Sequence, residues 1–177
     1  MAKDKNEGGF GDFFTDKDYT IPESSNFFKF KEGDNTFRVL SSAVTGYEYW
    51  TTDNKVVRSK TEFIGTPSDI KIDKEGKSKI NHFWAFMIYN YACKKIQLMT
   101  ITQKGIQKYL KGLIENPKWG SPKGYDITIN KTGSGFDTEY TPTAEPHSAM
   151  NPEVLEQYSK MNIDLDAIYE GGEVIKG

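Results

Sequence analysis

The feature that most constrains the fold is a hairpin pattern in the middle of the chain. The segment from His82 to Tyr91 is rich in aromatic and β-branched residues, Ala92-Cys93 makes a short break, and Lys94 to Ile101 returns as a second run. Two such runs joined by a short turn indicate an antiparallel β-hairpin. Of the 177 residues 36% are hydrophobic and 14% aromatic, a profile that suits a small barrel better than a helical bundle.

Two extended segments precede the hairpin. Residues 36–40 alternate polar and apolar side chains after a Gly-Asp-Asn turn signal, and residues 44–52 form a second extended piece. We interpret them as one long first strand, bent at Gly46. Residues 53–81 are rich in Lys, Asp, Gly and Ser and predict a long connection with at most a short strand at 55–58.

The apolar period changes after the hairpin. From Gln103 a helical stripe is predicted, with Thr102 as N-cap and Asn116-Pro117 as the end; its members are Ile106, Tyr109, Leu110, Leu113 and Ile114. Residues 125–131 and 136–141 predict a second hairpin. The order of elements matches a five-stranded OB-type barrel, mainly β, with one short helix between strands three and four. In that barrel the ligand face lies on strands two and three.

The chain divides into three parts. We expect a flexible N-terminal arm at 1–25, one OB-type domain at 26–146 and an acidic C-terminal helix and tail at 147–177. Residues 142–150 are interpreted as a linker, and Asn151-Pro152-Glu153 as the start of the C-terminal helix.

The net charge of −2 hides a segregation along the chain. Residues 29–131 carry 18 basic against 10 acidic residues, a net charge of +8, whereas residues 1–28 carry −3 and residues 132–177 carry −7. A basic body between acidic ends is typical of a phosphate-binding surface flanked by partner-binding tails. A solvated surface with chance asymmetry is the alternative.

Several classes of function find no support in the residue types. One cysteine and two histidines give no structural zinc set, and no nucleotide-binding loop, paired-carboxylate site or catalytic triad follows from spacing. We therefore expect no enzyme activity, no metal and no cofactor. The charged N-terminus and the lack of a long apolar run predict an intracellular protein without a membrane partner.

Aromatic and basic residues occur together at two places. Tyr47, Tyr49 and Trp50 come immediately before Lys55, Arg58 and Lys60, a pattern that favours base stacking combined with phosphate contact on single-stranded nucleic acid. The alternative for the three aromatics is a place in the barrel core.

On the predicted second strand the two faces differ. Trp84, Phe86 and Ile88 are assigned to the core, and the alternate set that includes Phe83, Tyr89 and Tyr91 is the outward, base-facing candidate. The opposite assignment of the two faces is the alternative. Further lysines are expected to extend the positive field: Lys94 and Lys95 at the hairpin tip, and Lys71, Lys74, Lys77 and Lys79 in the long connection.

A family resemblance accompanies these patterns. It is carried by the segments 27–35 (FFKFKEGDN), 37–41 (FRVLS), 46–50 (GYEYW), 82–86 (HFWAF), 89–91 (YNY), 101–104 (ITQK) and 125–127 (YDI). Between about Phe27 and Pro146 the chain resembles the single-stranded DNA-binding proteins of tailed bacteriophages. The resemblance implies an OB fold that binds and protects single-stranded DNA during phage replication or recombination, in the cytoplasm of the infected bacterial host. Arg38 within it is expected to contact DNA, and the acidic C-terminal tail is a candidate contact for replication proteins.

Two other classes of function compete with this one. The first is an OB-type protein-interaction module, such as an assembly or inhibitor protein, in which the aromatics face a protein partner. The second is a nuclease, which would need clustered acids to hold metal ions, and the basic body offers few.

Overall fold

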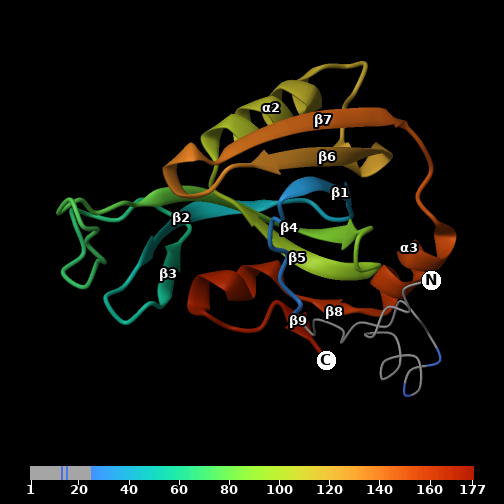
Figure 1. Ribbon diagram of the computed structural model, residues 1–177. Coiled ribbons are helices and arrows are strands. Elements are labelled where there is room, and N and C mark those ends of the chain that lie inside the picture. Colours follow the sequence, from blue (N-terminus) through green and yellow to red (C-terminus); the bar gives the residue numbers. More distant parts are fainter. Residues whose placement is uncertain (1–12, 14, 16–24) are drawn as a thin grey trace.

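The computed structural model describes Phe13, Thr15 and residues 25–177, so the predicted N-terminal arm lies almost wholly outside the described residues. Figure 1 shows the elements. The strands are β1 (Gly33–Val39), β2 (Val44–Trp50), β3 (Val56–Ser59), β4 (Asn81–Asn90), β5 (Lys95–Ile101), β6 (Tyr125–Thr132), β7 (Glu139–His147), β8 (Asn162–Ile163) and β9 (Ile175–Lys176). The helices are α2 (Lys104–Glu115) and α3 (Pro152–Lys160), with short 3₁₀ turns η1 (Pro122–Gly124), η2 (Gly135–Asp137) and η3 (Leu165–Glu170).

Strand β4 organises an antiparallel sheet of seven strands. One edge of β4 pairs with β2 along its first half and with β1 at its last residues, and its other edge pairs with β5. The sheet continues from β1 to β6 and β7, and β3 pairs with β2. The chain is therefore mainly β, as its sequence predicts, and α2 lies between the β4–β5 and β6–β7 hairpins.

The sheet curls but does not close into the five-stranded barrel expected from the sequence. Within the described residues β5 and β7 form no ladder with each other. The gap between them is crossed by the segment 26–31: Phe28 N donates to Leu98 O on β5 at 2.9 Å, and the Phe30 ring lies 5.0 Å from the Tyr140 ring on β7. The strand count also differs, because the expected first strand is two strands and the long connection contributes β3.

The main core lies inside the curl, under α2. It contains Phe37 and Val39 of β1, the alternate residues of β4 that include Phe86 and Ile88, and apolar side chains of β5 and β6. Helix α2 forms because Ile106 and Leu110, one turn apart, both reach this core. Its N-cap is Gln103 rather than Thr102, and no side chain caps it.

A second core covers the opposite face of β4 and β5. Phe83, Ala85 and Met87 of β4 pack there against Met150, Val154, Ile168 and Val174 of the C-terminal segment. Figure 1 shows this segment, in red, beneath the β4–β5 hairpin. Residues 150–175, for which the sequence predicts an acidic helix and tail, therefore form a packed cover over the sheet. The cover has six acidic residues and one basic residue and turns its charged side chains outward.

Two predicted boundaries are wrong for identifiable reasons. The first strand breaks at residues 40–43, and Gly46 lies in an unbroken stretch of β2 opposite Phe83. Strand β7 continues to His147, so most of the predicted linker is strand. The prolines of β7 are tolerated because this strand pairs only with β6 in the described chain. An edge strand can leave proline nitrogens unpaired.

None of the helices in the described part of the chain is long and apolar enough to cross a membrane.

Gly46 is required by close packing. A Cβ added there would lie 2.3 Å from the carbonyl oxygen of Ser59 and 3.1 Å from the rings of Phe83 and Tyr169. We expect Gly46→Ala to lower the free energy of unfolding by about 1–3 kcal/mol or more, since overpacking forces backbone shifts. Urea unfolding measures this, with Gly105→Ala as the control because a Cβ at that position on α2 meets open space. Equal stability of parent and Gly46→Ala would contradict the close approach.

Candidate nucleic-acid interface

The long connection after β2 is held against the end of that strand. Thr52 N donates to Asp69 O at 2.9 Å and Lys71 N donates to Trp50 O at 2.7 Å. The Tyr49 hydroxyl donates to Asp69 Oδ1 at 2.9 Å. The connection is thus an ordered part of the fold, and its backbone is fixed beside Trp50.

A tight turn then returns the chain toward Trp50. Asp73 Oδ1 accepts hydrogen bonds from the backbone nitrogens of Glu75 and Lys77, both at 2.9 Å. Gly76 adopts the left-handed conformation the turn requires, with φ of 76°. The Asp73 carboxylate thus holds the turn through two backbone nitrogens.

These contacts create a groove with one flat ring and several cations. The groove has a volume of about 480 Å³ and is lined by Trp50, Lys71, Asp73, Lys77, Lys79 and Asn81. Trp50 is 48% exposed, so much of its indole is open to a ligand. The Lys71 ammonium donates to Asn54 Oδ1 at 2.7 Å, and Lys77 pairs with Glu75 at 3.5 Å on the exposed surface, where such pairs are weak. We call this site the Trp50 groove.

The three aromatics predicted on β2 do not share one face. Trp50 ends the strand on one side, whereas Tyr47 and Tyr49 point to the other because side chains alternate along a strand. Tyr49 is buried, with its ring 5.0 Å from that of Phe63. Tyr47 is half-buried, 5.2 Å from the His82 ring, and the negative charge of Glu62 raises its pKa. Trp50 is therefore the stacking candidate of this set.

The three cations predicted around β3 differ in exposure and do not form one basic surface. Lys55 and Lys60 flank the strand and are exposed. Arg58 lies inward, with its guanidinium 5.5 Å from the centre of the Phe83 ring and 3.9 Å from the buried Glu48 carboxylate. Burial lowers the pKa of Arg58 and raises that of Glu48. Arg58 thus acts in packing rather than as a free phosphate contact.

Arg38 is the clearest correction to the predicted site. Its side chain is 1% exposed, and Nε donates to Asp126 Oδ1 at 2.7 Å. The other guanidinium nitrogens donate to Lys123 O, Ser148 O and Ser148 Oγ. Each of its side-chain nitrogens donates to a protein acceptor, so Arg38 joins β1, β6 and the segment before α3 and is buried away from an external ligand.

The predicted base-facing side of β4 is covered. Phe83 is fully buried by the C-terminal segment, and Tyr89 is half-buried at the edge of the same cluster. Tyr91 is 36% exposed at the end of the strand, and its hydroxyl donates to Asp126 Oδ1 at 2.8 Å. The predicted exposure of this face is wrong for Phe83, because Val154 and Ile168 of the C-terminal segment pack in the same cluster and cover it.

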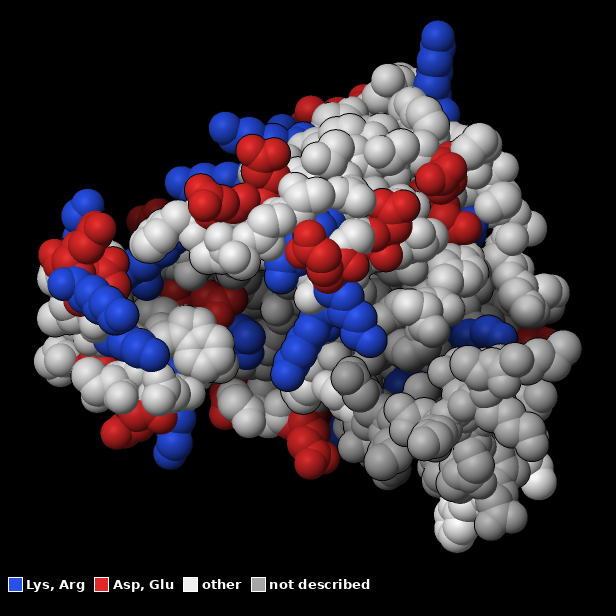
Figure 2. Space-filling model, in the orientation of Figure 1, with Lys and Arg blue, Asp and Glu red and all other residues white. Residues whose placement is uncertain are grey.

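The predicted lysines at the hairpin tip lie far from the Trp50 groove. Lys94 is exposed in a left-handed turn with φ of 53°, and Lys95 is half-buried opposite Asn90. They occupy the end of β4 opposite to Asn81, which lines the groove. Figure 2 shows basic side chains at the left end and across the centre of the visible face, with acidic ones among them.

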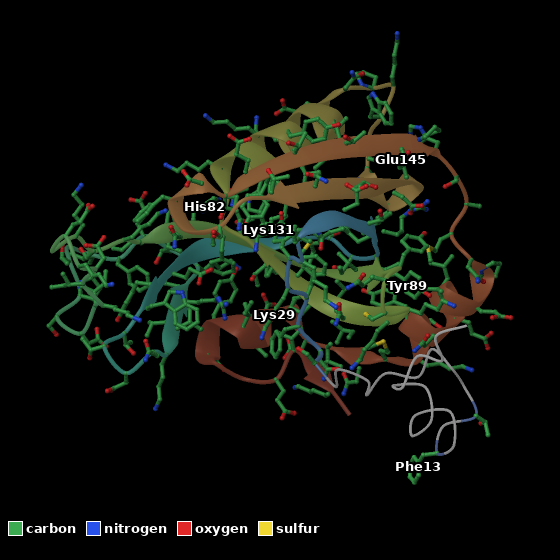
Figure 3. All side chains as sticks on the ribbon, viewed as in Figure 1. Phe13, Lys29, His82, Tyr89, Lys131 and Glu145 are labelled. Carbon is green, nitrogen blue, oxygen red and sulfur yellow. The ribbon has the colours of Figure 1, made fainter. Side chains whose placement is uncertain are left out.

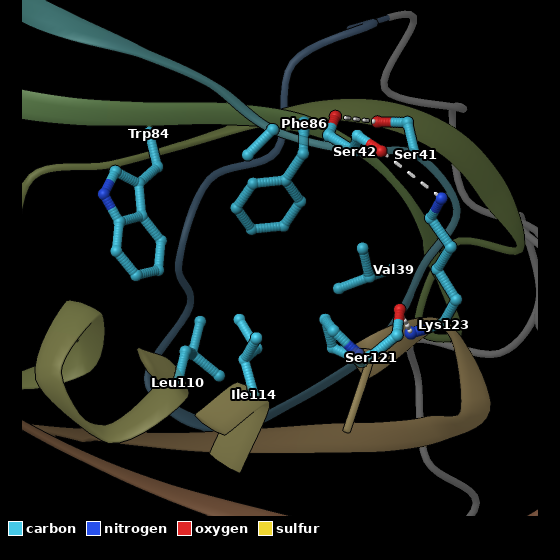
Figure 4. A pocket seen from close by; sticks show the side chains of 11 residues that line it. Val39, Ser41, Ser42, Trp84, Phe86, Leu110, Ile114, Ser121 and Lys123 are labelled. Carbon is cyan, nitrogen blue, oxygen red and sulfur yellow. Dashed lines mark hydrogen bonds between the residues drawn. The ribbon is translucent and has the colours of Figure 1, made fainter. Parts of the chain in front are cut away.

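A second hollow has a different character. It has a volume of about 190 Å³ and is lined by Val39, Ser41, Ser42, Ala43, Trp84, Phe86, Leu110, Ile114, Ser121, Pro122 and Lys123. Figure 4 shows the Trp84 and Phe86 rings facing Leu110 and Ile114, with Lys123 at one side bonded to Ser42. Its walls are mostly apolar, and it holds one cation where the Trp50 groove holds three.

Among the residues that the structure describes, no group of three or more His, Cys, Asp or Glu side chains is placed to hold a metal ion. Cys93 is exposed and forms no disulfide.

Comparison with known proteins gives one informative similarity. A probable ssDNA-binding protein of Escherichia phage T5 is 30% identical to this chain over 141 residues. The match covers 64% of this chain and 52% of that protein, so the chain spans about half the length of this curated relative. No family model matches the chain, and no solved structure matches it.

The structural role of Arg38 can be tested by unfolding. Removing one partner of a buried ion pair typically costs about 3–5 kcal/mol, because the remaining groups lose their hydrogen bonds. We expect Arg38→Ala to lower the free energy of unfolding by that amount, and Lys55→Ala, an exposed control, to change it by less than about 0.5 kcal/mol. An Arg38→Ala protein as stable as the parent would show that the pairing with Asp126 is dispensable.

Tyr91 predicts a specific response to alkaline pH. Burial and the hydrogen bond to Asp126 raise its pKa to about 12 from an ordinary value of 10.0. A raised pKa means that the contribution of Tyr91 to stability is complete below pH 10 and is lost as pH rises through 12. The stability difference between the parent and Tyr91→Phe should therefore change across that window in urea unfolding. Absorbance titrations of the parent and of Tyr91→Phe give the ionisation of the Tyr91 phenol by difference. Ionisation of this phenol near pH 10 would refute the raised pKa.

Proposed function

We propose that this protein binds and protects single-stranded DNA without strong sequence preference, as a non-catalytic protein of phage DNA replication or recombination in the cytoplasm of the infected bacterial host. The observation that carries the proposal is the Trp50 groove. Its exposed indole offers a flat surface, and Lys71, Lys77 and Lys79 offer cations beside it. The name of the phage T5 relative supports the same class of ligand.

The chemistry of the groove fits sequence-tolerant recognition. Every base has a π-face, so a stacking ring accepts any base, at about 1–3 kcal/mol for each. Lysine ammonium groups attract the phosphates of the strand and release counterions, which contributes affinity independent of sequence. The backbone that carries Trp50 and Lys71 is hydrogen-bonded in place. The entropic cost of ordering the site on binding is thereby reduced.

We further propose that the sheet is an open variant of the OB-type barrel. In support, β4 pairs with β1, β2 and β5, β1 also pairs with β6, and β6 pairs with β7. The Trp50 groove is lined by the long connection that follows β2. An OB-type barrel has a ligand-binding loop after its first strand, and this connection is at the corresponding place in the predicted order of elements. The exposed carboxylates of the C-terminal cover remain our candidate contact for replication proteins.

An interaction module is the second candidate, favoured by one observation. The apolar hollow between α2 and β4 has walls suited to an apolar side chain of a protein partner. The ligand distinguishes the two candidate functions. Saturable binding of oligo-dT at moderate salt is expected of the DNA-binding protein and not of the interaction module. A protein that binds no oligo-dT at any salt concentration would leave only the second.

Two kinds of substitution distinguish stacking from phosphate contact. Trp50→Ala should weaken oligonucleotide binding by about 1–3 kcal/mol and leave its salt dependence nearly unchanged. Lys77→Gln and Lys79→Gln should each lower the slope of log K against log salt by about 0.7. Fluorescence titrations at several salt concentrations measure both quantities.

Control variants test whether these effects are specific to the groove and independent of stability. Lys118→Gln, after α2, and Lys160→Gln, at the end of α3, remove exposed lysines that do not line the groove, and should leave the slope unchanged. Tyr49→Ala removes a buried ring and should lower the free energy of unfolding by about 3–5 kcal/mol, whereas Trp50→Ala should cost much less. If a folded Trp50→Ala protein binds DNA as the parent does, the groove is not the site.

A further inference from the structure

The segment that crosses the gap between β5 and β7 has two different faces. Phe28 and Phe30 point inward and pack against the main core. The alternate residues point outward: Phe27 is 60% exposed, and Lys29 and Lys31 are exposed. This extended segment therefore presents one free aromatic ring and two cations on its outer side, which are the two components that binding of a single strand requires.

The segment is held rigidly at both ends. At its start, Leu98 N donates to Asn26 O at 2.8 Å, next to the bond from Phe28 N to Leu98 O. At its end, the buried Asn35 side chain accepts from Lys31 N at 2.9 Å and donates to Lys31 O at 2.8 Å. The outward side chains thus stand on fixed backbone, and a ligand does not have to order a loop.

A small hollow lies beside the outer face of this segment. It has a volume of about 70 Å³, and Phe27, Lys29 and Lys31 form one side of it. The other side comes from the tip of the β4–β5 hairpin, including Asn90, Cys93 and Gln97. The amides of Asn90 and Gln97 are hydrogen-bonded to each other at 3.0 Å, so this wall is also ordered.

Strand β4 connects this hollow with the Trp50 groove. Asn81, its first residue, lines the groove, and Asn90, its last, lines the hollow. At about 3.3 Å per residue the two sites are about 30 Å apart along the strand. In Figure 3, Lys131 and Lys29 both lie on the visible face, between His82 at the start of β4 and Tyr89 near its end.

The surface beyond Phe27 is unfavourable for a DNA strand. On its other side this ring borders a hollow lined by Glu173, Val174 and Ile175 of the C-terminal segment. The Glu173 carboxylate there opposes phosphate, since like charges repel. A strand that reaches Phe27 therefore does not continue over the C-terminal cover.

We propose that Phe27, Lys29 and Lys31 form a second subsite for single-stranded DNA, in which Phe27 stacks a base and the lysines contact phosphates. One strand then spans from the Trp50 groove at one end of β4 to Phe27 beside the other end, over the face that carries Lys131 and Lys29 and not over the buried strand itself. This inference rests on the proposed function, because it extends the same ligand to a second place. Affinity should accordingly rise in two steps with oligonucleotide length: short strands fill one subsite, and longer strands span both.

The experiment is a titration of the full chain with oligo-dT of graded length, from about 4 to 16 nucleotides, the range of site sizes for OB folds. Phe27→Ala should weaken the longest oligonucleotide by about 5- to 150-fold, the affinity equivalent of one stacked base. It should abolish the second step in affinity. The double variant Lys29→Gln, Lys31→Gln should reduce the salt slope for long strands by about 1.4, two phosphate contacts.

Controls separate a local effect from loss of structure. Leu155→Ala removes a side chain of similar exposure from α3, within the C-terminal segment, and should leave both steps intact. Phe28→Ala, in contrast, removes an inward ring of the same segment and should lower thermal stability. Phe27→Ala is expected to unfold like the parent, because its ring is mostly in solvent.

The outcomes distinguish this inference from the proposed function. If the parent binds no oligonucleotide, or Trp50→Ala has no effect at any length, the proposed function or its site fails. If Trp50→Ala weakens all lengths while Phe27→Ala binds long strands as the parent does, the second subsite alone is overturned. A change of oligomeric state in Phe27→Ala by sedimentation, with unchanged dependence on length, would assign this ring to a protein contact and overturn it too.

Discussion

The burial of β4 on both faces is the constraint on which the rest of this structure depends. One set of alternate residues enters the core under α2, and the other is covered by the C-terminal segment. A strand buried on both sides loses its contrast between polar and apolar faces, which explains why aromatic and aliphatic residues run through it without interruption. The cover also removes the broad face of the β4–β5 hairpin from contact with a ligand. Exposed aromatic and basic side chains therefore lie at the two ends of the strand, in the Trp50 groove and beside Phe27.

The long connection after β2 shows how exposed lysines are fixed at one of these ends. Alone, a lysine-rich loop would carry its charges on mobile backbone and order them only on binding. Here Tyr49 anchors Asp69, and the backbone of Lys71 is bonded to that of Trp50. A buried tyrosine thus has an indirect role: it holds the loop whose lysines line the groove. The burial of Tyr49 and the exposure of Trp50, adjacent residues on one strand, are two parts of the same arrangement.

The sequence predicted those parts of the fold that depend on local pattern. The central hairpin and α2 follow from periodicity and turn residues, and both are present close to their expected limits. Strand β7 was predicted too short because prolines argue against a strand unless it lies at an edge, and edges are a property of the whole sheet. The break at residues 40–43 coincides with the small residues Ser41, Ser42 and Ala43, but small residues alone do not tell a bend within one strand from a division into two.

The site was predicted less well, because exposure depends on distant segments. Arg38 would suit phosphate, but Asp126 and Ser148 approach it only in the folded chain. Phe83 alternates correctly with core residues, yet Val154 and Ile168 bury its face. The lysines of the connection after β2 are predicted as a set, whereas Phe27 enters only through the segment 27–35 that carries the family resemblance. Its alternation with Phe28 could have marked it as an outward ring.

The C-terminal cover has a consequence for how the chain folds. The central hairpin can form as soon as it is synthesised, because its contacts are local. Its outer face, with Phe83, Ala85 and Met87, meets its partners only after residues 150–174 have been made. Until then an apolar strip of the sheet faces solvent, and species of that kind are prone to aggregate. Synthesis of residues 150–174 therefore determines when this strip is buried and the nascent protein is no longer prone to self-association through it.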